Sequence, residues 1–375
     1  MATETNRHDR AQSILVWDLP TRLFHWLLVA SVSFALATGL FAPKWWVGRH
    51  IWAGYIVGAL LIFRTIWAFH GSEFSRLRSF LYPPRQAMQH LRGMLDRRQT
   101  HHLGHNPAGA MMIFALIAIL ALIVATGFFV QGGFVKQGAF AGFVSYAVGD
   151  GMRGIHQLLA YLLLAMIAAH VAGVLVGSWL FKERLIGAMI DGEKPAPATA
   201  DGASPSPSRP LPAILWLTAI GGLFAIALSL LWRVPPLGVP AMPANQAMLE
   251  ECGACHHTFH PSLLPRASWA KMMANLTDHF GEDASLTAAK RDEIAAYLEL
   301  YAAEAWDTSA AHRFSVISAD QPMRITATPA WQRIHRRLDA AVFKRPAIKT
   351  KINCIACHRD ADSGRFDPQA IALPP

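Results

Sequence analysis

Two histidines, His156 and His170, lie fourteen residues apart in one apolar stretch. In a helix that rises about 1.5 Å per residue, their imidazoles would lie roughly 21 Å apart along the axis and within roughly 40° of the same face. The stretch, residues 154–180, is long enough to cross a bilayer. Because ionisable side chains inside a membrane usually mark function, and neutral imidazole is an axial ligand of haem iron, the pair indicates haem binding. The alternative is two polar side chains hydrogen-bonded inside a helix bundle.

A second chemical pattern, Cys-x-x-Cys-His, occurs twice near the C-terminus. The two copies are Cys252, Cys255 and His256, and Cys354, Cys357 and His358. This spacing lets both cysteines form thioethers to a porphyrin while the next residue, histidine, coordinates the iron, which is the haem c attachment signature. A thiol redox site or a zinc site is the competing interpretation. The two copies, each followed by histidine, and an outward location, where haem c is assembled, favour two haems c.

The composition is that of a membrane protein. Of 375 residues, 53% are hydrophobic and only 16% are charged, and five apolar runs cover about 21–41, 51–69, 109–130, 154–180 and 211–232. The formal charge of +9 does not indicate nucleic acid, because the arginines lie in the loops between these runs. We find no acid–base pair, nucleophile or phosphate loop that would support hydrolysis or group transfer.

The distribution of positive charge predicts the orientation. Lysine and arginine are concentrated before the first apolar run, in the second connection and after the fourth run, whereas the first and third connections carry few. The positive-inside rule therefore places the N-terminus in the cytoplasm. Five crossings then place the C-terminal domain in the periplasm. We expect a multi-pass protein of the bacterial inner membrane.

With this topology, four histidines of the apolar runs pair by depth in the bilayer. His25 starts an outgoing helix and His170 lies far along an incoming one, so both are at the inner side. His50 and His156 each start an incoming helix, so both are at the outer side. This predicts two noncovalent haems b, each held by two histidines. His70 points to roughly the opposite face of its helix from His50, which argues against it as a ligand.

Other residues of this region leave alternatives open. Gly54, on the same face as His50, provides room for a flat macrocycle or allows close packing of helices. Arg64 contacts a haem propionate or extends to the membrane interface. His105 is a quinone or haem contact or a polar residue at a helix start, where Asn106 is suited to the N-cap and Pro107 to the first helical position.

Several of these residues carry a family resemblance. They form the strings Trp17-Asp18-Leu19-Pro20-Thr21-Arg22, Phe24-His25-Trp26, His50 with Gly54-Tyr55, Phe63-Arg64 and Gly104-His105-Asn106-Pro107, with His156 and His170. Residues 14–190 thereby resemble the prokaryotic cytochrome b561 family, which includes the b-type subunits of nickel-iron hydrogenases. The resemblance implies a four-helix bundle with two haems that exchanges electrons with a quinone.

The remaining iron ligands of the two haems c rest on a second resemblance. Ser268-Trp269, the string from Asp278 to Ala284, and Arg324-Ile325-Thr326 leading to His335 are similar to the dihaem cytochrome c family. On that resemblance His279 is the sixth ligand of the first haem and His335 that of the second. The rivals are His257, His260, His312, Met272 and Met273.

We therefore expect an all-α protein. A transmembrane four-helix di-haem bundle (1–192) is followed by a cytoplasmic Pro/Ala/Ser linker (193–211), a fifth tethering transmembrane helix (212–233) and a small periplasmic α-helical dihaem cytochrome c domain (234–375). Acidic residues follow the first Cys-x-x-Cys-His string, and basic residues between 333 and 351 precede the second.

The expected function is electron transfer from a membrane quinol through two haems b and two haems c to a soluble periplasmic redox protein. Whether the chain is itself a quinol:cytochrome c oxidoreductase stays open. The alternatives are the cytochrome anchor subunit of a larger dehydrogenase or hydrogenase, or a haem-based sensor. A homodimer is left open.

Overall fold

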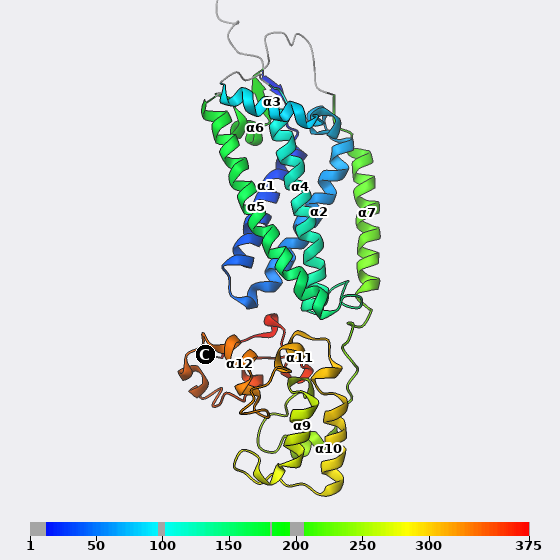
Figure 1. Ribbon diagram of the computed structural model, residues 1–375. Coiled ribbons are helices and arrows are strands. Elements are labelled where there is room, and N and C mark those ends of the chain that lie inside the picture. The colour runs from blue at the N-terminus through cyan, green and yellow to red at the C-terminus, as the bar shows by residue number, and fades with distance from the viewer. Residues whose placement is uncertain (1–12, 97–101, 181, 196–205, 375) are drawn as a thin grey trace, which may run out of the picture. The chain divides into compact units, whose positions relative to one another are not determined.

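The structure is a computed structural model that describes residues 13–96, 102–180, 182–195 and 206–374, and these residues are mainly helical (Figure 1). They form two compact units. The bundle unit contains residues 13–41, 49–127 and 154–227, and the C-terminal unit contains 42–48, 128–153 and 228–374. Two loops between long helices thus belong to the C-terminal unit.

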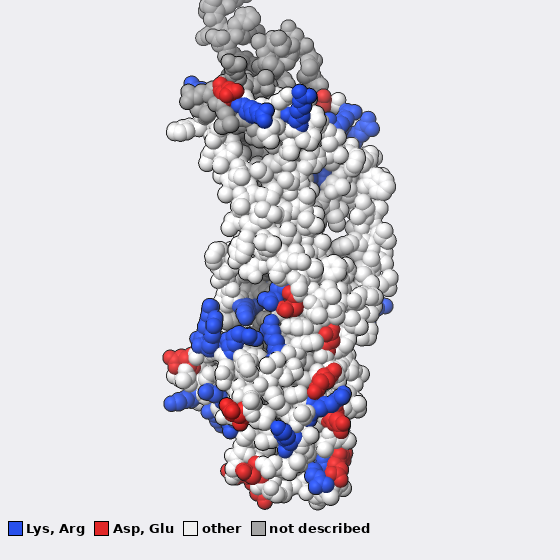
Figure 2. All heavy atoms as spheres, in the orientation of Figure 1, with Lys and Arg blue, Asp and Glu red and all other residues white. Residues whose placement is uncertain are grey.

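Five helices are long and apolar enough to cross a membrane. They are α1 (Leu19–Leu40), α2 (Val47–His70), α4 (Pro107–Phe129), α5 (Tyr146–Leu180) and α7 (Pro210–Leu231). Figure 2 shows a broad band of the bundle unit almost without charged side chains, as expected for a surface in lipid. The five apolar runs predicted from the sequence are confirmed as helices.

The start of α5 differs from the prediction. The helix begins at Tyr146 rather than near residue 154, so His156 lies about three turns inside it and not at its start. Its first turns are polar and include Asp150 and Arg153, which form an ion pair at 2.9 Å across one helical turn. Hydropathy alone does not separate such a polar first turn from a loop.

The bundle core joins four of the long helices. Val32 of α1, Val57 of α2, Ile119 and Leu120 of α4, and Leu163 of α5 form one buried cluster. Helix α7 packs separately on α2, where Ala213 contacts Ile66 and Trp67. This agrees with a four-helix bundle and an additional fifth helix.

Shorter elements complete the bundle unit. They are η2 (Glu73–Ser75), η3 (Leu77–Phe80), α3 (Pro84–Leu95), α6 (Leu185–Asp191) and an antiparallel pair, β1 (Ser13–Leu15) with β2 (Glu193–Pro195). Gly192, at φ +90°, ends α6, and a Cβ there would lie 2.5 Å from the Trp17 carbonyl oxygen. The segment predicted as a linker from residue 193 therefore begins as a strand.

The C-terminal unit is built from short helices. They are η1 (Lys44–Trp46), the π-helical turn η4 (Val130–Phe134), α8 (Gln246–Glu251), η5 (Pro261–Leu263), α9 (Arg266–Ala274), η6 (Leu276–Asp278), α10 (Ala288–Leu300), η7 (Ala303–Ala305), α11 (Ser309–Phe314), η8 (Ile325–Ala327), α12 (Pro329–His335), η9 (Ala340–Lys344), η10 (Cys354–Ala356), η11 (Ala361–Ser363) and η12 (Pro368–Ala370). Leu263, Leu264, Trp269, Ile294 and Leu298 lie in its main core.

Side-chain caps start several of these helices. Asn245, Thr287 and Thr308 each accept a hydrogen bond from a backbone N–H in the first turn of α8, α10 and α11. Thr328 does the same for α12, with Pro329 at the first position, as the sequence predicts.

Candidate haem sites

His50 and His156 face each other in the bundle. Their ring centroids are 6.0 Å apart and the rings are nearly perpendicular. His50 Nδ1 donates to the Ala35 carbonyl oxygen at 2.9 Å, and His156 Nδ1 donates to the Ile123 carbonyl oxygen at 3.0 Å. A histidine that donates from Nδ1 to a carbonyl is held in one tautomer and orientation, with Nε2 free to bind a metal.

Glycines leave space around these two rings. A Cβ at Gly39 of α1 would lie 2.9 Å from the His50 ring, and one at Gly127 would lie 3.5 Å from the His156 ring. At Gly54 a Cβ would meet no described atom within 4 Å, whereas at Gly58 it would contact Val124. Gly58 therefore serves helix packing, and Gly54 borders open space of the kind that a flat macrocycle needs.

His25 of α1 and His170 of α5 form the second candidate pair, close enough to interact electrostatically. The His25 ring packs edge-on against Trp26 at 5.1 Å. Within the described residues, its buried Nδ1 has no hydrogen-bond partner. An unpaired buried polar atom costs about 1–3 kcal/mol, so this ring fits a site that contains a further group.

Arg64 is buried rather than extended to a surface. Its side chain is 7% exposed, and one terminal guanidinium nitrogen has no partner among the described residues. The guanidinium lies 5.5 Å from the Phe80 ring centroid. The structure therefore disfavours an Arg64 side chain that extends to the membrane interface. It favours the other alternative, in which the guanidinium contacts a buried anionic group such as a haem propionate.

His105 is not a solvated residue at a helix start. Its ring lies 4.4 Å from Trp17 and 5.3 Å from Phe80. Burial, aided by the positive charges of Arg64 and Lys194, lowers the pKa of His105 to about 3, so the ring is neutral at physiological pH. Asn106 accepts from Gly109 N–H at 2.7 Å and caps α4, as predicted.

Asp18 is a residue that our sequence analysis did not single out. It caps α1 by accepting from Thr21 N–H at 3.0 Å, and it also accepts from the Trp67 indole at 3.1 Å and from Ser72 N–H at 3.0 Å. It thereby ties the start of α1 to the end of α2. The Asp-Leu-Pro string, an N-cap before proline, was the available signal.

In the C-terminal unit, the first Cys-x-x-Cys-His string lies opposite His279. The ring centroids of His256 and His279 are 6.2 Å apart. His256 Nδ1 donates to the His257 carbonyl oxygen at 2.8 Å. His279 is held in a tight turn, where its N–H donates to the Glu282 carbonyl at 2.7 Å and Phe280 and Gly281 adopt positive φ.

The second string lies opposite His335. Its ring is 6.2 Å from that of His358, and His335 Nδ1 donates to the Trp331 carbonyl oxygen at 2.9 Å. His358 Nδ1 is buried without a partner among the described residues. Burial raises the pKa of the Cys354 thiol to about 11, whereas a thiol–disulfide redox site has acidic thiols. None of the four cysteines forms a disulfide.

The rival sixth ligands have other partners. His260 Nδ1 accepts from Ser262 N–H at 3.2 Å, and the ring packs on Trp306 at 4.7 Å. Met273 is part of the main core, and Met272 packs against it. His257 and His312 each contact an aspartate, Asp362 at 3.3 Å and Asp307 at 2.9 Å.

Three imidazole pairs thus share one spacing, 6.0–6.2 Å between ring centroids. A metal–imidazole bond is about 2 Å long, so each pair has room for one metal ion between its rings. Two pairs lie beside the twin cysteines that a covalent haem requires. Together with five membrane-spanning helices, these sites define a membrane-bound haemoprotein.

Comparison with known proteins identifies both parts. Residues 16–192 match the sequence profile of prokaryotic cytochrome b561, and residues 248–366 match that of dihaem cytochrome c. The chain therefore belongs to these two families, as a cytochrome b561 membrane domain joined to a dihaem cytochrome c domain.

Curated relatives cover the membrane part. The probable Ni/Fe-hydrogenase 1 B-type cytochrome subunit of Escherichia coli K12 is 25% identical over 218 residues, which is 50% of this chain and 92% of that protein. A probable Ni/Fe-hydrogenase B-type cytochrome subunit of Rhizobium leguminosarum is 22% identical and covers 49% of this chain and 89% of its own length.

Solved structures cover the C-terminal part. The diheme cytochrome c from Rhodobacter sphaeroides is 35% identical, covers 33% of this chain and 98% of its own, and gives a TM-score of 0.29. The diheme cytochrome type c from Shewanella baltica OS155 is 29% identical, covers 36% of this chain and 95% of its own, and also gives 0.29. The protein carries b-type haems in its membrane domain and covalently bound haems c in its C-terminal domain, and it transfers electrons.

Proposed function

We propose that this protein conducts electrons from a membrane quinol to a soluble periplasmic acceptor. Haems supply one-electron oxidation and reduction at four sites, two b-type and two c-type. The observation that carries the proposal is the repeated spacing of facing imidazoles. In the His50–His156 pair both rings donate from Nδ1 to a backbone carbonyl. In each of the two pairs of the C-terminal unit, one ring does so, His256 and His335 respectively.

We assign the ligands as follows. In the bundle, His25 pairs with His170 and His50 with His156. In the dihaem domain, the pairs are His256 with His279 and His335 with His358. Cys252, Cys255, Cys354 and Cys357 form the thioethers. Arg64, buried with an unpartnered nitrogen, would balance the charge of a haem propionate in the bundle.

The proposed direction of electron flow, outward across the membrane, rests on the distribution of positive charge along the chain. Positively charged residues before α1, between α2 and α4, and after α5 support a cytoplasmic N-terminus and a periplasmic dihaem domain in the bacterial inner membrane. With the inside negative, outward electron movement is then favoured by about 2.3 kcal/mol per 100 mV.

A second candidate is the role that the names of the relatives describe, a b-type cytochrome subunit of a hydrogenase. The protein would then be the membrane anchor of a larger complex. Purification under mild conditions distinguishes the two, because an anchor subunit brings a catalytic subunit with it and an independent conduit does not.

The test is a haem count followed by reduction kinetics. Pyridine haemochrome analysis of the purified protein should give two haems b and two haems c per chain. His156→Ala should remove one haem b and keep the other, because the His25–His170 site shares no ligand with it. His70→Ala is the matched control, since His70 also donates from Nδ1 to a carbonyl in α2 but belongs to no proposed pair.

Rapid mixing with a reduced quinol analogue should then reduce all four haems of the unchanged protein. Retention of both haems b in His156→Ala would contradict the ligand assignment. Failure of the quinol to reduce the haems b at a rate above that of a water-soluble reductant would contradict the quinol as donor.

A further inference from the structure

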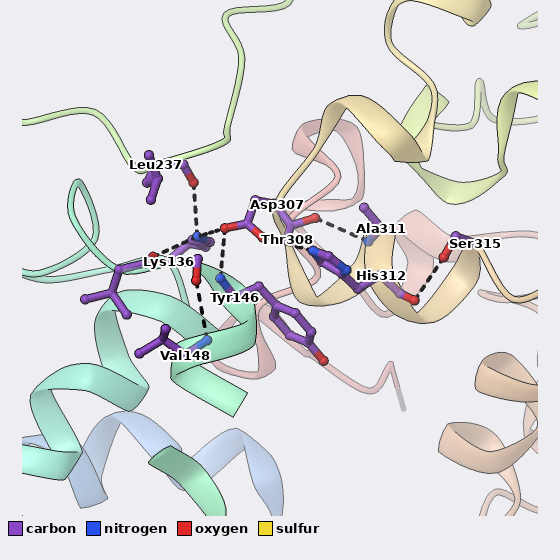
Figure 3. Close-up of polar contacts among 11 residues, drawn as sticks. Lys136, Tyr146, Val148, Leu237, Asp307, Thr308, Ala311, His312 and Ser315 are labelled. Atoms are coloured by element: carbon purple, nitrogen blue, oxygen red, sulfur yellow. Dashed lines mark hydrogen bonds and ion pairs between the residues drawn. The ribbon is translucent and has the colours of Figure 1, made fainter. Parts of the chain in front are cut away.

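A buried lysine lies in the loop between α4 and α5. The Lys136 side chain is only 3% exposed, and its backbone adopts φ +58°, which is unusual for a residue with a side chain. Its ammonium nitrogen donates to the Val144 carbonyl at 3.0 Å, the Leu237 carbonyl at 3.0 Å and the Asp307 carboxylate at 2.7 Å (Figure 3). All three N–H donors of the ammonium are therefore used.

The three acceptors come from segments far apart in the sequence. Val144 belongs to the same loop, Leu237 follows α7, and Asp307 precedes α11 of the dihaem domain. All of them lie within the C-terminal unit, to which this loop belongs. One ammonium group therefore joins the loop, the segment after α7 and the dihaem domain.

Asp307 extends the same contact to the first residue of α5. Its carboxylate also accepts from Tyr146 N–H at 2.8 Å and from His312 Nε2 at 2.9 Å, and the rings of Tyr146 and His312 stack at 4.5 Å (Figure 3). Burial raises the pKa of Asp307, but hydrogen bonds from Lys136, Tyr146 and His312 outweigh it, so the pKa lies below its usual value. The carboxylate is therefore ionised at physiological pH.

Backbone hydrogen bonds and a close approach at Gly238 surround the Lys136–Asp307 ion pair. Asp307 N–H donates to the Gly238 carbonyl at 2.7 Å, and Leu237 N–H donates to the Ala141 carbonyl at 2.8 Å. Gly238 has φ +68°, and a Cβ there would lie 2.3 Å from Asp307 Cβ. The Lys136 carbonyl accepts from Arg365 of the dihaem domain at 2.9 Å.

We propose that Lys136 and Asp307 are positioning residues that lock the dihaem domain onto the α4–α5 loop and thereby set the rate of electron transfer between the haems b and the haems c. This inference rests on the proposed function. Tyr146 and His156 are parts of one continuous helix, so the contact at Tyr146 fixes the domain to the helix that carries a haem b ligand.

The contact should be sensitive to single substitutions. When one partner of a buried ion pair is removed, the other is left as a buried, uncompensated charge. Lys136→Met keeps the aliphatic length without the ammonium, and Asp307→Asn keeps the shape without the charge. Lys290→Met is the matched control, because it removes an exposed lysine that pairs with Glu251 within the dihaem domain.

The experiment uses the full-length protein in lipid nanodiscs. After mixing with a quinol analogue, we expect the haems b to be reduced at the unchanged rate in Lys136→Met and Asp307→Asn, and the haems c at least about tenfold more slowly. Haem content and the four midpoint potentials should not change. Lys290→Met should behave as the unchanged protein, and the double variant should be no slower than either single variant, because both break one contact.

A second measurement does not depend on electron flow. Limited proteolysis should cleave the segment between 232 and 245 faster in both lock variants than in Lys290→Met. If the quinol fails to reduce the unchanged protein, the proposed function fails while the proteolysis still tests the lock. Unchanged haem c reduction and unchanged cleavage in fully haem-loaded variants would overturn the inference.

Discussion

Asp18 offers a direct test of how the bundle is held together. Its 9% exposed carboxylate accepts three hydrogen bonds, from Thr21 N–H, the Trp67 indole and Ser72 N–H. Each buried donor that loses its acceptor costs about 1–3 kcal/mol, so Asp18→Ala should lower the stability of the membrane domain by at least about 3 kcal/mol. For a domain of this size, that corresponds to a fall in Tm of at least about 6 °C.

Asp18→Asn separates charge from shape. One carboxylate oxygen accepts from Thr21 and the other from Ser72, so the asparagine NH₂ group must face one of these N–H donors. Asp18→Asn should therefore lose less stability than Asp18→Ala, but the loss should be well above zero. The assay is thermal loss of the haem b absorbance in detergent, with the haem c absorbance of the covalent sites as internal reference.

Ionisation of Asp18 should also make the stability of the membrane domain depend on pH. Burial raises the pKa of Asp18, but its hydrogen bonds with Thr21 and Ser72 lower it more, so the folded pKa lies below the unfolded value of about 3.9. The stabilisation is therefore complete above about pH 4 and is lost as the pH falls through the folded pKa. Asp18→Asn should lack this acid limb. An asparagine variant as stable as the unchanged protein at pH 7, with the same acid limb, would refute the reasoning.

Three further changes test other parts of the molecule. Gly238→Ala should slow haem c reduction as the lock variants do, since its Cβ would overlap that of Asp307, and stopped-flow absorbance measures it. His335→Ala should leave both haems c on the denatured chain in a haem-stained gel but convert one to a high-spin spectrum, whereas loss of covalent haem would contradict this. Trp269→Phe removes a buried hydrogen bond to the Pro261 carbonyl at 2.7 Å and should destabilise the dihaem domain by about 1–3 kcal/mol, measured by denaturant unfolding.

The long helices were predictable because the bilayer imposes a length and a composition. About twenty apolar residues are needed to span it, and the sequence contains five such runs. The prediction was least accurate at α5, where two polar turns precede the apolar stretch. There Asp150 and Arg153 form an ion pair across one helical turn. A hydropathy pattern does not distinguish such a polar helical turn from a loop.

Histidine pairing was partly predictable for a similar reason. Alternating crossings give each residue a depth, and residues of equal depth on different helices can meet, so His50 and His156 were expected together and lie 6.0 Å apart. Depth alone does not reveal what orients the rings. The acceptors, the Ala35 and Ile123 carbonyls, are backbone atoms without a sequence signature.

Apart from the histidine pairs, contacts between distant segments were not predicted. Ser13 pairs with Pro195, and Lys136 pairs with Asp307, across separations for which no local periodicity exists. The burial of Arg64 was left open, because an arginine near a helix end is compatible with a haem propionate contact as well as with snorkelling. In each case the partner lies on another element, and only the folded chain brings it near.

Asp18 and Asp307 solve one physical problem in the two units in the same way. A haem protein must hold ligands from different helices in fixed positions, yet its loops connect elements only locally. Each aspartate accepts from one donor nearby in the sequence, Thr21 or His312, and from two distant ones. The distant donors are Trp67 and Ser72 in one unit and Lys136 and Tyr146 in the other. A carboxylate suits this task, because its two oxygens provide about four acceptor sites and its charge strengthens every bond. Rigidity around the haem sites therefore depends on hydrogen-bonded carboxylates at the ends of the helices as well as on apolar packing along them.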